Sequence, residues 1–196
     1  MAEKRDIKAQ IIESATGFFS KYGFHKTTMD EIAKHIHKAK GVLYYYFTSK
    51  EKLFNEVLKQ ELGGLKTALS EIVDSDDNSI NLLTNYMLTR FSLLNHAVNY
   101  HETLKADFFE KYHFVKDVRD DFDAFEKRQL TAIIEKGNRE GYLGVQNVKA
   151  TVDVAMMIIK GIEIPLFLQN KYSEYENTLQ ELMTMITNSL QVPPRE

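Results

Sequence analysis

Apolar residues recur at three- and four-residue steps along nearly the whole chain, a spacing that places them on one face of an α-helix. The first such stripe, from Ile7 to Tyr22, predicts a helix over residues 5–22. Gly23 follows it directly, and glycine accepts the left-handed conformation that commonly ends a helix. We therefore expect the first helix to end at this glycine.

Capping residues predict two short helices and then a long one. Thr28 and Glu31 have the spacing of a capping box, which starts a second helix of about two turns. A third short helix follows almost at once, over residues 39–46. Thr48 or Ser49 can then cap a fourth helix, which is much longer.

The rest of the chain continues the helical pattern. Pro165 is expected to kink the most apolar helix, because proline lacks the amide N–H that the helix needs. No segment convincingly predicts a strand. We therefore expect an all-α fold of about nine helices, the later ones over residues 49–73, 80–96, 100–112, 114–138, 147–169 and 173–191.

Composition excludes several classes of protein and site. The 196 residues contain no cysteine, which excludes disulfide scaffolds, thiol nucleophiles and cysteine-ligated metals. No apolar run approaches the roughly 18 residues that a membrane span needs, and no secretory signal is visible at the start. We expect a cytoplasmic protein without membrane contact, with no metal and no resident cofactor.

Charge is divided unevenly along the chain. Residues 1–60 carry a net charge of +4, whereas residues 61–196 carry −7. The basic part coincides with the three short helices, of which the second and third are joined by a tight turn. This arrangement is typical of a helix-turn-helix DNA reader, whose last helix enters the major groove.

The third helix carries residue types that suit contact with DNA. Its first turn and a half hold Lys38, Lys40, Gly41, Val42 and Tyr45. Lysine can donate to guanine or to phosphate, and glycine allows the backbone to approach closely. Tyr44 and Tyr46 flank Tyr45, so the three rings cannot all face one way, and an exposed tyrosine hydroxyl is a good phosphate donor.

Two helix N-termini offer further phosphate sites. Backbone amides at Thr27–Thr28 and at Ser49–Lys50 could each donate to a phosphate, with Lys26 and Lys50 beside them. The alternative is that these residues are ordinary caps and solvated lysines, since capping boxes occur in many helices.

Two stretches of the chain form a longer pattern. They are Gly23-Phe24-His25-Lys26-Thr27-Thr28-Met29-Asp30-Glu31-Ile32-Ala33 and Gly41-Val42-Leu43-Tyr44-Tyr45-Tyr46-Phe47-Thr48-Ser49-Lys50-Glu51-Lys52-Leu53. Both closely resemble the TetR family of bacterial transcriptional regulators, and the resemblance covers roughly residues 7–58. It departs in the turn, where Ile36-His37-Lys38-Ala39 replaces the usual Ala-Gly-Val-Ser. His37 then has to adopt the turn conformation that glycine normally supplies.

The resemblance implies which residues meet DNA. It places Lys40, Gly41, Val42, Tyr44 and Tyr45 on the DNA, with Thr27, Thr28 and Lys50 on phosphates, while Tyr46 and Phe47 pack inside. It also implies a helix-turn-helix DNA-binding domain over residues 1–48 and a larger helical regulatory and dimerisation domain over residues 49–196.

Members of this family dimerise through their last two long helices and hold an inducer inside the regulatory domain. Helices 147–169 and 173–191 are then the expected pair, with candidate interface residues Val152, Met156, Ile159, Leu166, Leu179, Leu182, Met183 and Ile186. The alternative is that both helices pack within one subunit. Candidate pocket residues are Met87, Phe91, Phe108, Tyr112, Phe125 and Met156, although such stripes are also typical of a core.

The function implied by the resemblance is that of a sequence-specific transcriptional regulator. We expect a repressor that binds an inverted-repeat operator in double-stranded DNA as a homodimer and is released by a small-molecule inducer. The alternative is a helical protein-interaction module that has lost specific DNA binding. An enzyme is not expected, because Glu110-x-x-His113 is a single copy of a spacing that di-iron bundles need twice.

Overall fold

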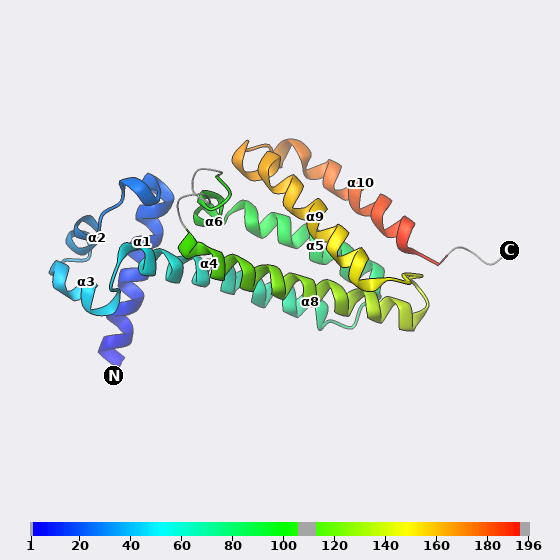
Figure 1. The fold of residues 1–196 in the computed structure, drawn as a ribbon, viewed down its shortest axis with the longest axis horizontal. Helices are drawn as coiled ribbons and strands as arrows, with labels where there is room; N and C mark the ends of the chain where they lie inside the picture. The colour runs from blue at the N-terminus through cyan, green and yellow to red at the C-terminus, as the bar shows by residue number, and fades with distance from the viewer. Residues whose placement is uncertain (1, 106–112, 193–196) are drawn as a thin grey trace. The chain divides into compact units, whose positions relative to one another are not determined.

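The computed structural model describes residues 2–105 and 113–192, and most of them are helical (Figure 1). In these ranges the chain forms nine α-helices, one 3₁₀ turn and one π-helical turn, and its only extended pairing is an isolated antiparallel bridge between Leu143 and Gln191. The expected all-α fold is confirmed. No helix of the described ranges combines the length and apolarity required to cross a bilayer.

The chain divides into two compact units. The first unit comprises residues 1–63 and 97–119, and the second comprises residues 64–96 and 120–196. Helices α4 (Lys50–Val73) and α8 (Lys116–Glu140) therefore contribute residues to both units. This division is defined by which residues pack together. The expected boundary after residue 48 instead separates a DNA-binding part from a regulatory part, and it stays a prediction.

The first unit contains the helices that open the chain, drawn in blue and cyan in Figure 1. They are α1 (Ala2–Lys26), α2 (Met29–His35), α3 (Lys40–Tyr46) and the start of α4, together with α6 (Val98–Glu102), the 3₁₀ turn η1 (His113–Val115) and the start of α8. The core is aromatic: the ring centroids of Phe19 and Phe24 each lie 5.0 Å from that of Phe54. These contacts join α1 to α4.

Local signals in the sequence mark where these helices start and where α1 is interrupted. Gly23 has a φ of 80°, which interrupts α1 before its last turn. The Thr28 hydroxyl accepts the Glu31 amide while the Glu31 carboxylate accepts the Thr28 amide, so the expected capping box is confirmed. Of the two candidate caps of α4, Ser49 is used, because its Oγ accepts the amide of Lys52 at 3.3 Å.

The second unit contains the remaining helices. They are α5 (Ser79–Asn95), α9 (Val148–Glu163), the π-helical turn η2 (Ile164–Leu168) and α10 (Tyr172–Leu190), with the end of α4 and most of α8. Helix α10 packs against α5. Pro165 lies at the start of η2, so the predicted disturbance at this proline takes the form of a change from α- to π-helical bonding.

Three buried charged side chains connect helices of the second unit. Arg90 of α5, Glu126 of α8 and Glu163 of α9 each expose 1% or less of their surface. The Arg90 guanidinium donates to both carboxylates, including a 3.1 Å hydrogen bond from Nη2 to Oε2 of Glu126. Because a buried charge without a counter-charge is costly, this network favours one register of the three helices.

The chain turns tightly after α8. A Cβ on Gly137 would lie 2.5 Å from Cδ1 of Leu143 and 2.6 Å from Oγ of Ser79, so a larger residue would force these side chains to shift. The Gly137 carbonyl accepts the amides of Tyr142 at 3.0 Å and Leu143 at 3.1 Å. The glycine therefore allows both the loop after α8 and the start of α5 to pack closely against the end of α8.

Candidate nucleic-acid interface

A tight turn joins α2 to α3, and the two helices pack against each other. The His37 amide donates to the Lys34 carbonyl at 3.1 Å, and the Lys38 amide donates to the Ala33 carbonyl at 2.9 Å. His37 has a φ of 53°, in the left-handed region that favours glycine. The expectation that His37 takes the place of the turn glycine is confirmed.

Helix α3 is anchored on one side and exposed on the other. Leu43 is fully buried, and Phe47, which follows the helix, is buried too. The other side presents Lys40, Gly41, Tyr44 and Tyr45, which we call the α3 face. Tyr45 exposes 66% of its surface, and nothing lies within 4 Å of the position that a Cβ on Gly41 would occupy. A partner can therefore approach both the side chains and the backbone of this face.

The remaining expected DNA-contact residues differ in their exposure. Lys26, Thr28 and Lys38 are exposed, whereas Val42 is half-buried. Tyr46, which was expected inside, is half-buried with its ring edge-on to that of Tyr45 at 5.2 Å. Contact with DNA is a prediction for all of these residues.

Lys40 is paired within the helix-turn-helix motif. Its Nζ lies 3.1 Å from Oδ1 of Asp30 on α2 and 5.8 Å from the ring centroid of Tyr44. The hydrogen bond to Asp30 raises the pKa of Lys40 above its usual value. A partner that binds this ammonium therefore has to compete with a carboxylate.

Lys50 and Thr27 hold the end of α1 together. The Lys50 ammonium donates to the carbonyl oxygens of Phe24 at 2.8 Å and Thr27 at 2.9 Å, and it stands 4.4 Å from the Phe24 ring centroid. Burial lowers the pKa of Lys50. Thr27 is buried, and its hydroxyl donates to the carbonyls of Gly23 and Phe18 at 2.9 and 3.2 Å. Both groups expected on phosphates are thus engaged inside the first unit.

Two further interpretations concern metal chemistry. Within residues 2–105 and 113–192, no group of three or more His, Asp or Glu side chains is placed to hold a metal ion. Of the Glu110–His113 pair that the di-iron alternative requires, Glu110 lies outside the described residues. That alternative therefore gains no support here.

The second unit contains an apolar cavity of about 170 Å³ between α5, α8, α9 and α10, which we call the α9 cavity. Of the candidate pocket residues, Met87 lines it. Phe91, Phe125 and Met156 are buried but are not part of its lining, and Phe108 and Tyr112 lie outside the described residues. The lining residues are Leu83, Met87, Leu130, Ile134, Thr151, Val154, Ala155, Ile158, Ile159, Ile162, Leu182, Met183, Ile186, Ser189 and Leu190.

The candidate dimer residues are mostly buried in the single chain, and their place in an interface stays a prediction. Six of the eight are buried within the second unit, namely Val152, Met156, Ile159, Leu166, Leu179 and Met183, while Leu182 and Ile186 are half-buried in the cavity wall. The most regular apolar stripe of each helix faces its own core. A second apolar stripe of α9 is exposed instead: Val154 exposes 55% of its surface, Met157 74% and Ile158 39%.

Comparisons with known proteins match both the motif and the fold. Residues 11–57 match the family model described as bacterial regulatory proteins, tetR family. The transcriptional regulator QacR of Staphylococcus aureus is 26% identical over 164 residues, which cover 80% of this chain and 84% of QacR. The transcriptional repressor KstR2 of Mycobacterium tuberculosis is 24% identical over 140 residues, which cover 69% of this chain and 68% of KstR2.

A solved structure extends the match in fold beyond the motif. The transcriptional regulator FadR from Bacillus subtilis, in complex with stearoyl-CoA, has a TM-score of 0.72 to this chain at 19% identity. The match covers 89% of this chain and 96% of FadR. The likeness therefore includes the helices of both units.

Proposed function

Since this chain belongs to the TetR family of bacterial DNA-binding transcriptional regulators, we propose that it is a repressor that binds an inverted-repeat operator as a homodimer. Binding of a small molecule releases it from the operator. KstR2, which is described as a repressor, supports the direction of regulation. The proposed place of action is the cytoplasm, where the operator DNA would be found.

The exposed α3 face is the main observation that supports recognition of DNA sequence. It combines an ammonium, a backbone position without a side chain and two exposed phenols on one side of a helix whose other side is anchored by Leu43. An α-helix of this kind fits the major groove, where lysine can donate to guanine and tyrosine to phosphate. We assign base reading to Lys40 and Gly41 and phosphate contact to Tyr44 and Tyr45.

The contacts of Lys50 and Thr27 support fewer phosphate-contacting residues than the family resemblance implied. Their polar groups already bond to carbonyl oxygens at the end of α1. We therefore propose that both act indirectly, by fixing the start of α2. The exposed Lys26 and Thr28 remain the proposed phosphate contacts beside them.

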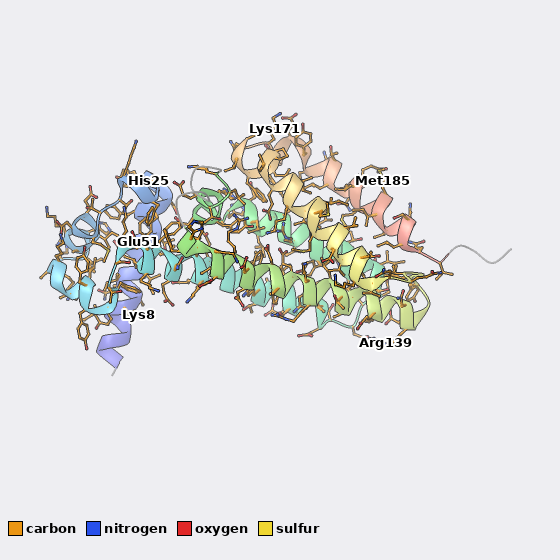
Figure 2. All side chains as sticks on the ribbon, in the orientation of Figure 1. Lys8, His25, Glu51, Arg139, Lys171 and Met185 are labelled. Atoms are coloured by element: carbon orange, nitrogen blue, oxygen red, sulfur yellow. The ribbon has the colours of Figure 1, made fainter. Side chains whose placement is uncertain are left out.

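The exposed stripe of α9 supports dimerisation. Val154, Met157, Ile158 and Gly161 follow the three- and four-residue steps of one helix face, and all four are exposed in the single chain. Met185 of α10, labelled in Figure 2, exposes a further 63% of its surface. Large exposed apolar patches mark association sites. We propose that a second copy covers this stripe. Reading of an inverted repeat by such a dimer requires two α3 helices about one DNA turn apart, roughly 34–36 Å.

The α9 cavity supports a small-molecule effector. It lies in the second unit, within the region expected to be regulatory. FadR, which shares the fold, was solved with stearoyl-CoA bound, so the fold accommodates small molecules in at least one relative. An effector acts only if it binds the released state more tightly than the DNA-bound state, and typical couplings are about 1–3 kcal/mol.

Selection of bound sequences from a random duplex DNA pool tests this function. At near-physiological salt, the purified chain should retain an inverted repeat, because a two-fold dimer reads two half-sites. A Tyr44→Ala/Tyr45→Ala variant, changed only at exposed positions, is the matched control and should retain less DNA. Recovery of no preferred sequence by the unchanged chain would favour the alternative of a protein-interaction module.

A further inference from the structure

We propose that the α9 cavity takes one small, uncharged, apolar molecule, and that a second copy of the chain closes the mouth of the cavity. This inference rests on the proposed homodimer. It adds the chemical class of the ligand, its approximate size and a link between ligand binding and dimerisation.

The chemistry of the lining defines the class of ligand. Thirteen of the fifteen lining residues are apolar, and none is charged. The two polar ones use their hydroxyl protons locally: Thr151 Oγ1 donates to the Asn147 carbonyl at 3.0 Å, and Ser189 Oγ donates to the Ile186 carbonyl at 2.7 Å. A charged ligand would lose its hydration without gaining a counter-charge. The cavity therefore selects neutral, apolar molecules.

The volume of the cavity limits the size of the ligand. About 170 Å³ is available in the single chain. An engineered apolar cavity of about 150 Å³ in another protein stays dry and binds benzene. One aromatic ring with a short substituent, or a short hydrocarbon chain, is therefore the expected size.

The mouth of the cavity coincides with the exposed stripe of α9. Val154 and Ile158 both line the cavity and are exposed to solvent, by 55% and 39% of their surface. Met157 lies on the same stripe but is not part of the lining. A second copy that covers the stripe also covers the two residues at the mouth, so the site is incomplete in one chain.

Closure by a second copy links the equilibrium of ligand binding to that of dimerisation. If the ligand binds more tightly to the closed cavity of the dimer, then the dimer must also be stabilised by the ligand, by the same factor. Ligand affinity should therefore rise with protein concentration across the range in which the dimer forms. A cavity complete within one chain would show no such dependence.

Calorimetric titration with toluene tests the site and the class of ligand. The unchanged full-length chain should bind toluene, whereas benzoate, a ring of similar size with a charge, should not bind detectably. Ala155→Leu places a larger side chain in the lining and should weaken toluene binding at least tenfold. Ala150→Leu, the same change at an exposed position of α9, is the matched control. No toluene binding, equal binding of benzoate or undiminished binding by Ala155→Leu would overturn the proposed site.

Met157→Lys tests closure by the second copy. This change puts a charge on the exposed stripe without altering the lining, and sedimentation should then report a monomer. The monomer should bind toluene at least tenfold more weakly than the unchanged dimer. A monomeric variant with undiminished toluene affinity would overturn the closure, while a dimer persisting in this variant would overturn the assigned interface. An unchanged chain that sediments as a monomer at all concentrations would instead overturn the proposed homodimer.

Discussion

The ammonium of Lys40 lies 3.1 Å from a carboxylate oxygen of Asp30, so α3 and α2 are joined by an ion pair at the α3 face. Both side chains are half or more exposed, and an exposed pair of this kind adds little to stability. Under the proposed function its main effect is on DNA binding, because Lys40 would have to leave or share Asp30 to contact a base.

Lys40→Ala and Asp30→Asn should change DNA binding in opposite directions. Loss of Lys40 should remove about 1–3 kcal/mol of discrimination between the selected operator and a scrambled duplex. Asp30→Asn removes a negative charge and releases Lys40, so affinity for both duplexes should rise. Fluorescence anisotropy with the two duplexes measures these changes. Equal losses on both duplexes for Lys40→Ala would contradict base reading by this residue.

Lys50→Ala should lower stability and weaken binding to every DNA sequence alike. Removing a charged donor from buried carbonyl groups costs about 1.5–3 kcal/mol, which urea unfolding measures. The slope of log affinity against log salt should not change, whereas loss of a direct phosphate contact lowers it by about 0.9. Lys52→Ala, at an exposed position of the same helix, is the control for charge and should leave stability nearly unchanged. A reduced salt slope for Lys50→Ala would restore Lys50 to the phosphate contacts.

His37→Gly should stabilise the chain. The left-handed conformation costs a non-glycine residue roughly 1–2 kcal/mol, which glycine avoids. Glycine also has more conformational freedom in the unfolded chain, and this lowers the net stabilisation by about 0.5–1 kcal/mol. Asn170, with a φ of 54°, is a matched position, but the short polar side chain of asparagine can hydrogen-bond locally and tolerates this conformation better. The midpoint temperature of thermal unfolding should therefore rise more for His37→Gly than for Asn170→Gly. The reverse order would mean that the imidazole makes a contact worth more than the strain.

Glu61→Gln should make stability less dependent on pH. Burial raises the pKa of Glu61, although its carboxylate accepts the Tyr100 amide at 2.9 Å. A carboxyl whose pKa is raised by folding contributes stability below its unfolded value of 4.5, and that contribution is lost as pH rises through the folded value. Urea unfolding between pH 4 and 7 should therefore show that the free energy of unfolding of Glu61→Gln increases relative to that of the unchanged chain as pH rises. A constant difference across this range would contradict the raised pKa.

Arg90→Met should destabilise the second unit severely. It leaves Glu126 and Glu163 buried without the guanidinium, and breaking a buried network from one side costs about 3–5 kcal/mol. Replacing all three together, by Arg90→Met/Glu126→Leu/Glu163→Met, should restore most of that loss, since apolar replacement of a whole buried network is often neutral. Denaturant unfolding of the two variants provides the comparison. A triple variant as unstable as Arg90→Met would show that the apolar side chains do not fill the same space.

The features that could be predicted from sequence are those set by near neighbours. The capping box needs only Thr28 and Glu31, and the break at Gly23 and the disturbance at Pro165 each depend on the backbone of one residue. The contacts of Lys50 could not be predicted in this way, because its partner carbonyls lie 23 and 26 positions earlier in the chain. No local pattern marks such a contact.

The interface residues show a second limit. Helix α9 is apolar on more than one side, so periodicity finds its stripes without telling which one meets the core. Ile159 and Ile158 are neighbours of the same type, yet the first is fully buried and the second is exposed. Only the positions of α5 and α8 decide between them, and these are set by packing over the whole unit.

The close approach at Gly137 also sets a limit on how this chain can change during evolution. Any added carbon atom at this position would meet Leu143 and Ser79 well inside van der Waals distance. A descendant without this glycine must therefore have shifted Leu143 and Ser79. Because the loop that holds Leu143 leads directly into α9, the α9 cavity is the place where such a shift would be expected to show.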